Sequence, residues 1–161
     1  MAPGDRVRTG PGAAARLVYF EGTVTEVGAE TGVLVQRLER GSGGNVITNL
    51  FQAAGTTVSR VVQLVDPAAT FEIETPAATA FVRGTTLRVQ VNRDGTTRVG
   101  SLRVGTEGTV ELQGKDPDRT RVTLRPGEES DVCPGQPPTR WHAQTATHPQ
   151  SRRRRLRPPA A

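Results

Sequence analysis

The 161-residue chain has very few of the side chains on which most enzymes and metal sites depend. It contains two histidines, one cysteine and a single lysine, Lys115, and no histidine precedes His142. Cys133, His142 and His148 lack the paired spacing of zinc ligands, and a cupin-type iron site needs a close histidine pair on its strands. Lys115 follows no glycine-rich phosphate loop. We therefore predict a non-enzymatic protein without catalytic residues, cofactor or metal ligands.

Long apolar runs are also absent. No stretch approaches the roughly 20 apolar residues that span a bilayer, and residues 1–5 do not begin a secretion signal. We therefore expect neither a membrane span nor a targeting signal in this chain. The lone Cys133 cannot form an internal disulfide, so cysteine usage does not identify a redox compartment.

The excess of positive charge is confined to one end of the sequence. The formal net charge is +5, and without five arginines near the C-terminus the 21 basic residues fall to 16, which equals the 16 acidic residues. A DNA-binding domain needs a basic face, so we expect no nucleic-acid binding through the folded part. We predict a solvated tail, with weak contact to an anionic surface as the alternative. The five tail arginines are Arg152, Arg153, Arg154, Arg155 and Arg157.

The clearest strand signal lies at residues 87–91, where apolar and polar side chains alternate. This alternation is typical of a half-buried strand, and the Asp94-Gly95 step that follows is a preferred dipeptide of tight hairpin turns. We therefore predict a β-hairpin here. Further hairpins are predicted at residues 105–108 and at Pro126-Gly127.

Other β-rich runs occur at residues 33–38, 45–51 and 57–65, separated by turn-forming residues at 41–44 and 53–55. The spacing of Val58, Val61 and Leu64 also suits a helix, because short apolar runs do not fix the period. We assign strand there. Aromatic residues make up only 4% of the chain, so we expect a core built mostly from Val and Leu.

Many short strands about ten residues apart, without a long helical period, predict an all-β fold. The candidates are a β-sandwich or roll of short antiparallel strands and a short β-solenoid. The strand pattern ends at Cys133, after which proline and polar residues dominate. We therefore predict one β domain over residues 1–132 and a disordered, Pro- and Arg-rich tail over residues 133–161.

A compact motif precedes the predicted hairpin: a Thr-Pro step, small residues and then Val-Arg-Gly-Thr. As a structural device, proline ends a strand, and Gly84 takes a conformation closed to other residues or admits a neighbouring strand. Arg83 then caps carbonyl groups or pairs with a carboxylate such as Glu72 or Glu74. As a functional device, the motif touches a partner protein. We favour the structural role and keep the motif as a candidate partner contact, with the residues Thr75, Pro76, Val82, Arg83, Gly84 and Thr85.

These residues, with Phe71 and Ile73 before them and the Asp94-Gly95 turn after them, resemble the signature of the FecR family. The resemblance spans residues 71–132, and residues 4–17 are similar to the family's opening segment. It implies a non-enzymatic signalling domain of the bacterial cell envelope, located in the periplasm or outside the cell. It also implies protein partners: members relay the state of a siderophore receptor to a sigma factor that controls iron-uptake genes.

The alternative function is a structural or carbohydrate-binding module of the cell envelope. Carbohydrate sites commonly offer aromatic platforms. Apart from Tyr19 and Trp141 the chain has only four Phe residues, which makes this reading the second choice.

Overall fold

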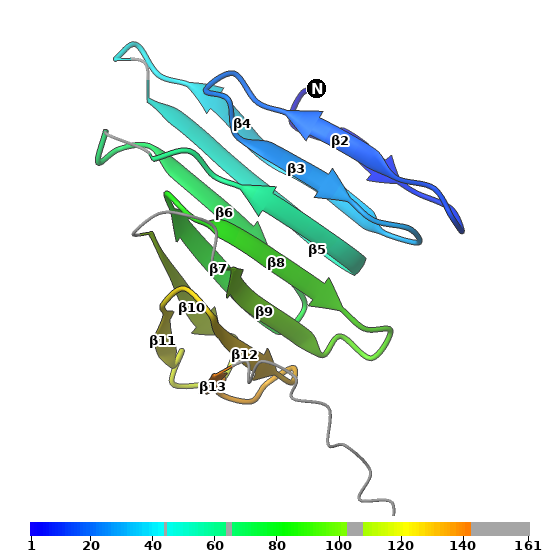
Figure 1. Ribbon diagram of the computed structural model, residues 1–161, viewed down its shortest axis with the longest axis vertical. Coiled ribbons are helices and arrows are strands. Elements are labelled where there is room, and N and C mark those ends of the chain that lie inside the picture. Colours follow the sequence, from blue (N-terminus) through cyan, green and yellow to red (C-terminus); the bar gives the residue numbers. More distant parts are fainter. Residues whose placement is uncertain (44, 64–65, 103–107, 143–161) are drawn as a thin grey trace, which may run out of the picture.

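The computed structural model describes residues 1–43, 45–63, 66–102 and 108–142, and all regular structure in these residues is β-strand (Figure 1). The prediction of an all-β fold is confirmed. No helix in the described residues is long and apolar enough to cross a membrane. In chain order the strands are β1 (Arg6–Arg8), β2 (Ala15–Val18), β3 (Val24–Val27), β4 (Gly32–Arg40), β5 (Val46–Arg60), β6 (Thr70–Glu74), β7 (Ala78–Arg83), β8 (Thr86–Val91), β9 (Thr97–Leu102), β10 (Thr109–Gly114), β11 (Arg121–Leu124), β12 (Glu128–Val132) and β13 (Thr139–His142).

The strands form two sheets that share β5. Sheet A has the order β1-β4-β5-β6-β7-β10-β11, and sheet B has the order β2-β3-β5-β8-β9-β12-β13. Neighbouring strands are antiparallel except for β5 and β6, which are parallel. From β6 onward the chain places two strands in sheet A and then two in sheet B. Figure 1 shows the result: the strands follow one another along the long axis, from β2 and β4 at one end to β11 and β13 at the other.

Strand β5 corrects one sequence expectation. Two strands were expected around a turn at residues 53–55, but Val46–Arg60 is continuous and pairs with sheet A up to Ala54 and with sheet B from Gly55. Gly55 has φ +89°, which other residues rarely adopt. The small residues therefore bend the strand from one sheet into the other instead of ending it. The helical alternative for Val58 is excluded, and Leu64 lies outside the described residues.

The turn residues serve two different purposes. Asp94-Gly95 makes the predicted hairpin between β8 and β9: the Asp94 carboxylate accepts the Thr96 N–H at 2.9 Å, and Gly95 has φ +86°. The hairpin predicted at residues 105–108 falls mainly outside the described residues. The hairpin predicted at Pro126-Gly127 is wrong, because β11 and β12 belong to different sheets. Pro126-Gly127 forms a tight turn, with Gly127 at φ +89°, that crosses from sheet A to sheet B.

The core lies between the inner faces of the two sheets and consists mostly of Val and Leu, as expected. The largest aromatic contribution is a perpendicular pair, Tyr19 and Phe71, with ring centroids 5.7 Å apart. Burial raises the pKa of Tyr19 to about 12, and its hydroxyl donates a hydrogen bond to Thr25 Oγ1. The two sheets are thus held together by short branched side chains that pack at alternate strand positions.

The two ends of the molecule differ. At the C-terminal end β11 lies against β12 and β13. At the N-terminal end β1 and β2 each have a strand neighbour on one side only, so both present an open edge among the described residues. Pairing also continues beyond Val132, the expected end of the domain, because β13 is hydrogen-bonded to β12. The absence of regular structure expected from Cys133 is therefore wrong for Thr139–His142. His148 and the arginines from Arg152 onward lie outside the described residues.

Candidate functional site

The Thr-Pro step of the signature motif forms a buried turn that is held by side-chain hydrogen bonds. Thr75 Oγ1 accepts the N–H groups of Ala78 at 3.1 Å and of Ala77 at 3.3 Å, which fixes the turn between β6 and β7. The same oxygen lies 2.8 Å from Thr97 Oγ1 at the start of β9. One hydroxyl therefore joins a turn of sheet A to a strand of sheet B.

The Arg-Gly-Thr part of the motif is the crossover from β7 in sheet A to β8 in sheet B. Gly84 has φ +59°, and a Cβ on Gly108 would come within 2.5 Å of the Gly84 carbonyl carbon. The expectation that Gly84 adopts a special conformation and admits another chain segment is confirmed. Val82 and Thr85 are buried on either side of it.

Arg83 behaves differently from the expectation. Its side chain is exposed, and neither Glu72 nor Glu74 is within ion-pairing distance; Glu74 instead pairs with Lys115 at 2.6 Å. Of the six motif residues, Thr75, Val82 and Thr85 are buried and Pro76 and Gly84 are half-buried, so Arg83 alone offers a fully exposed side chain. The partner-contact role of the motif stays a prediction.

No reactive cluster is found in the part of the chain that the structure describes. No three His, Cys, Asp or Glu side chains gather closely enough to hold a metal ion there, and Cys133 is exposed. Among the carboxylates, Asp116 accepts hydrogen bonds from the Thr120 hydroxyl at 2.7 Å and the Thr120 N–H at 3.0 Å. These bonds lower the pKa of Asp116 and close the turn between β10 and β11.

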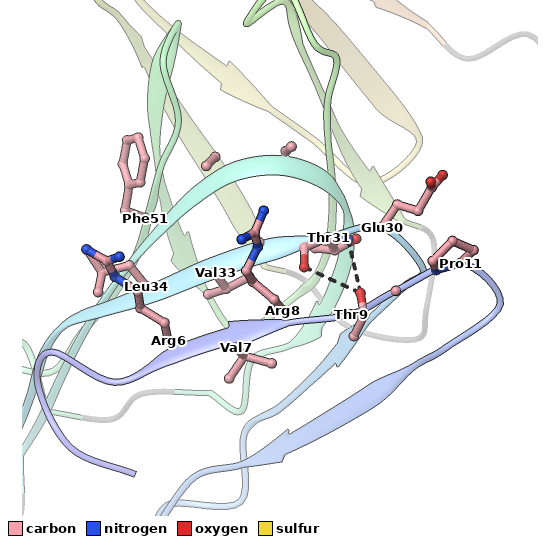
Figure 2. Close-up of a pocket in the computed structure, with 14 residues that line it drawn as sticks. Arg6, Val7, Arg8, Thr9, Pro11, Glu30, Thr31, Val33, Leu34 and Phe51 are labelled. Carbon is pink, nitrogen blue, oxygen red and sulfur yellow. Dashed lines mark hydrogen bonds between the residues drawn. The ribbon is translucent and has the colours of Figure 1, made fainter.

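A groove of about 590 Å³ lies on the outer face of sheet A, beside the open edge β1. We call it the β1 groove. Its apolar floor comes from Leu34 on β4 and from Phe51 and Ala53 on β5. Arg6 and Arg8 on β1 stand along its rim, with Glu30 near one end. Figure 2 shows the two arginines and Phe51 on the same side of the sheet, while Val7 points to the opposite side.

Strand alternation produces this arrangement. Val7 lies opposite the buried Val33 in the register of β1 and β4, so it faces the core, whereas Arg6 lies opposite Leu34 on the outer face. The sequence analysis missed the groove. The alternating Arg6-Val7-Arg8 triplet was the available signal, but an open edge beside it is a property of the tertiary fold.

Within the described residues, several cations on the outer face of sheet A are paired with carboxylates, whereas Arg6 and Arg8, like Arg83, are not. Arg37 pairs with Glu39 at 2.8 Å, Lys115 with Glu74, and Arg121 with Glu111. Neither Arg6 nor Arg8 has a carboxylate within ion-pairing distance among the described residues. Their charges are therefore available to a molecule in the groove.

The half-buried aromatic rings on the outer faces are covered by cations instead of forming open platforms. Lys115 Nζ lies 5.9 Å from the ring centroid of Phe51, and the guanidinium of Arg121 lies 5.8 Å from that of Phe81. Arg98 stands 5.2 Å over Trp141 on sheet B. These three rings are therefore not open platforms for a sugar, whereas Phe20, just after β2, is 68% exposed.

The same fold occurs in two crystal structures of a protein from Parabacteroides distasonis, provisionally described as an anti-sigma factor and solved at 1.65 and 2.50 Å resolution. Their TM-scores are 0.67 and 0.66, with 18% sequence identity, and the match covers 86% of this chain. It covers 59% of each of those chains, so the present chain spans less than two thirds of their length. Among curated proteins, none matches the chain.

Fold and surface together define an all-β domain of two sheets that share β5, with β1 and β2 as open edges at the N-terminal end. The family model described as "FecR protein" matches residues 5–111, which is more than half of the sequence. The chain belongs to the FecR family. FecR proteins are a family of signalling regulators.

Proposed function

We propose that this domain is the sensor part of a cell-envelope signalling relay. In this proposal it works in the periplasm, binds the signalling segment of an outer-membrane siderophore receptor and passes the state of that receptor toward a sigma factor. The sigma factor then controls iron-uptake genes. Family membership over residues 5–111 supports a regulatory role.

One structural observation carries the protein-binding part of the proposal: β1 and β2 are both open edges at the same end of the molecule, and the β1 groove lies beside one of them. Unpaired N–H and C=O groups of an edge strand accept a further strand, and pockets beside the edge select its side chains. A surface of this kind suits a protein ligand.

The exposed Arg83 at the crossover between the sheets is proposed as an additional contact. The remaining motif residues hold the crossover in shape, so an Arg83→Ala variant removes the contact without altering the buried part of the motif. We expect this variant to weaken receptor binding while its thermal unfolding stays unchanged.

The test is a calorimetric titration. The purified chain is titrated with the periplasmic signalling domain of a siderophore receptor from the same organism, and the heat of binding is measured. We expect a one-to-one complex, and we expect deletion of the gene to change transcription of a sigma-dependent iron-uptake reporter. The signalling domain of an unrelated transporter serves as the control. If no receptor domain binds and the reporter does not respond, the proposed function is wrong.

A further inference from the structure

We propose that β1 is the docking edge for an extended acidic segment of a partner protein, which adds to sheet A as one more strand and pairs its carboxylates with Arg6 and Arg8. The inference rests on the proposed function, because it names the kind of segment that the partner presents. It extends that function by assigning a binding site and a ligand chemistry to residues outside the signature motif.

The backbone of β1 is oriented for strand addition. The Val35 N–H donates to the Asp5 carbonyl at 2.9 Å, and the Thr9 N–H donates to the Thr31 carbonyl at 3.0 Å. Alternate residues of an antiparallel strand direct their N–H and C=O groups to opposite sides. The groups of Arg6 and Arg8 therefore point away from β4, toward the open edge.

The side chains at these positions select for negative charge. Arg6 and Arg8 lie two residues apart, so both project to the groove side of the sheet (Figure 2). A strand added beside β1 places alternate side chains next to them, at the distance of a cross-strand pair. Carboxylates at two alternate positions of the partner would thus supply the ion pairs that Arg6 and Arg8 lack within the described part of the chain.

The groove restricts which side chains the partner segment can carry at its remaining positions. Its floor, formed by Leu34, Phe51 and Ala53, is apolar, and its volume of about 590 Å³ leaves room for side chains that reach over the edge. Glu30 near the other end disfavours a further carboxylate there. The segment that fits is short, extended and amphipathic, with acidic residues only beside the two arginines.

The other open edge, β2, is a weaker candidate for this ligand. It carries the exposed Val18, at 63% exposure, with Arg16 as its only cation, and Phe20 just beyond the strand is 68% exposed. The β1 groove has no lining residue from β2. A neutral, apolar strand would suit β2, whereas the paired charges of β1 specify an acidic one.

The experiment measures binding of an extended peptide in which Glu and Val alternate, by fluorescence anisotropy. We expect binding that weakens as sodium chloride rises, and a loss of about tenfold or more in affinity for the double variant Arg6→Glu/Arg8→Glu. The matched control is Arg60→Glu/Arg88→Glu, which changes the net charge equally at exposed positions of sheet B and should bind within about twofold of the unchanged chain. Urea unfolding of both variants verifies that they fold.

A second peptide tests whether backbone hydrogen bonds to β1 are needed for binding, without any change in the protein. It has the same sequence but carries N-methyl groups on the residues that would donate to β1, so it keeps its charge and loses its strand hydrogen bonds. We expect it not to bind. Equal binding of the two peptides, or equal weakening by both double variants, would overturn strand addition at β1.

The outcomes separate this inference from the proposed function. If the receptor domain binds the unchanged chain and the Arg6→Glu/Arg8→Glu variant equally well, the docking edge is wrong and the relay stands. If the acidic peptide binds at β1 but no receptor domain does, the edge stands and the relay is wrong.

Discussion

Thr31 occupies the space in which a side chain of Gly55 would stand. A Cβ added to Gly55 would lie 2.5 Å from Thr31 Cα, and the Thr31 hydroxyl oxygen accepts the Thr56 N–H at 3.0 Å. Thr31 also accepts the Thr9 N–H through its carbonyl, while its own N–H donates to Thr9 Oγ1 at 3.0 Å. One residue therefore connects the bend of β5 to the end of β1 through hydrogen bonds.

The first prediction concerns this bend. Gly55→Ala should lower the free energy of unfolding by about 2–4 kcal/mol, because φ +89° strains alanine and the added carbon meets backbone atoms of Thr31. Urea unfolding measures the change. Gly10→Ala is the matched control, since nothing lies within 4 Å of a Cβ there. Equal stability of the two variants would show that the close contact does not hold the bend.

Local sequence signals identify turn residues but not what a turn does. Asp94-Gly95 and Pro126-Gly127 look alike as turn signals, yet the first closes a hairpin and the second crosses between sheets. Gly55 looks like a third turn and is a bend within a strand. The difference lies in contacts with residues distant in sequence, such as Thr31, that a local pattern does not contain.

The second prediction concerns the Thr-Pro step. Thr75→Val should cost about 1–3 kcal/mol of unfolding free energy, because it leaves the Ala77 and Ala78 N–H groups and the Thr97 hydroxyl without the oxygen that they bond. The matched control is Thr79→Val, a half-buried threonine on the outer face of β7, which we expect to be close to neutral. Thermal unfolding of both variants measures the difference. Equal stability of the two variants would show that the Thr75 hydroxyl does not stabilise the turn.

The third prediction is a pH dependence from Glu72 on the outer face of sheet A. Burial raises the pKa of Glu72, although Arg37 nearby counteracts the shift. A carboxyl whose pKa is higher in the folded state stabilises the fold while it is protonated, and this contribution is lost as the pH rises through the folded pKa. Glu72→Gln should therefore raise the melting temperature at neutral pH and lose that advantage in acid.

The measurement for Glu72 is a series of melting curves from acidic to neutral pH. Glu26→Gln, at an exposed position of β3, is the control and should leave the curves unchanged. A Glu72→Gln variant whose advantage is constant across the series would contradict a titrating, buried carboxylate as its cause.

The candidate site was less accessible to sequence reasoning than the fold. The signature residues Thr75, Pro76 and Gly84 gave a direct signal of backbone geometry, because Gly and Thr-Pro steps encode turns. Arg6 and Arg8 gave no such signal. Their importance depends on the unpaired edge of β1 and on Phe51, which β5 brings under them from a distant part of the chain.

The central claim is that the domain binds a partner protein at its open edge. Amide hydrogen exchange tests this most directly, measured by NMR with and without the receptor signalling domain. The account predicts that the Arg6 and Arg8 amides, which point to solvent in the free chain, become protected in the complex, while the amides of β13 at the far end do not change. Protection that spares β1, or no protection anywhere in the presence of saturating receptor domain, would contradict it.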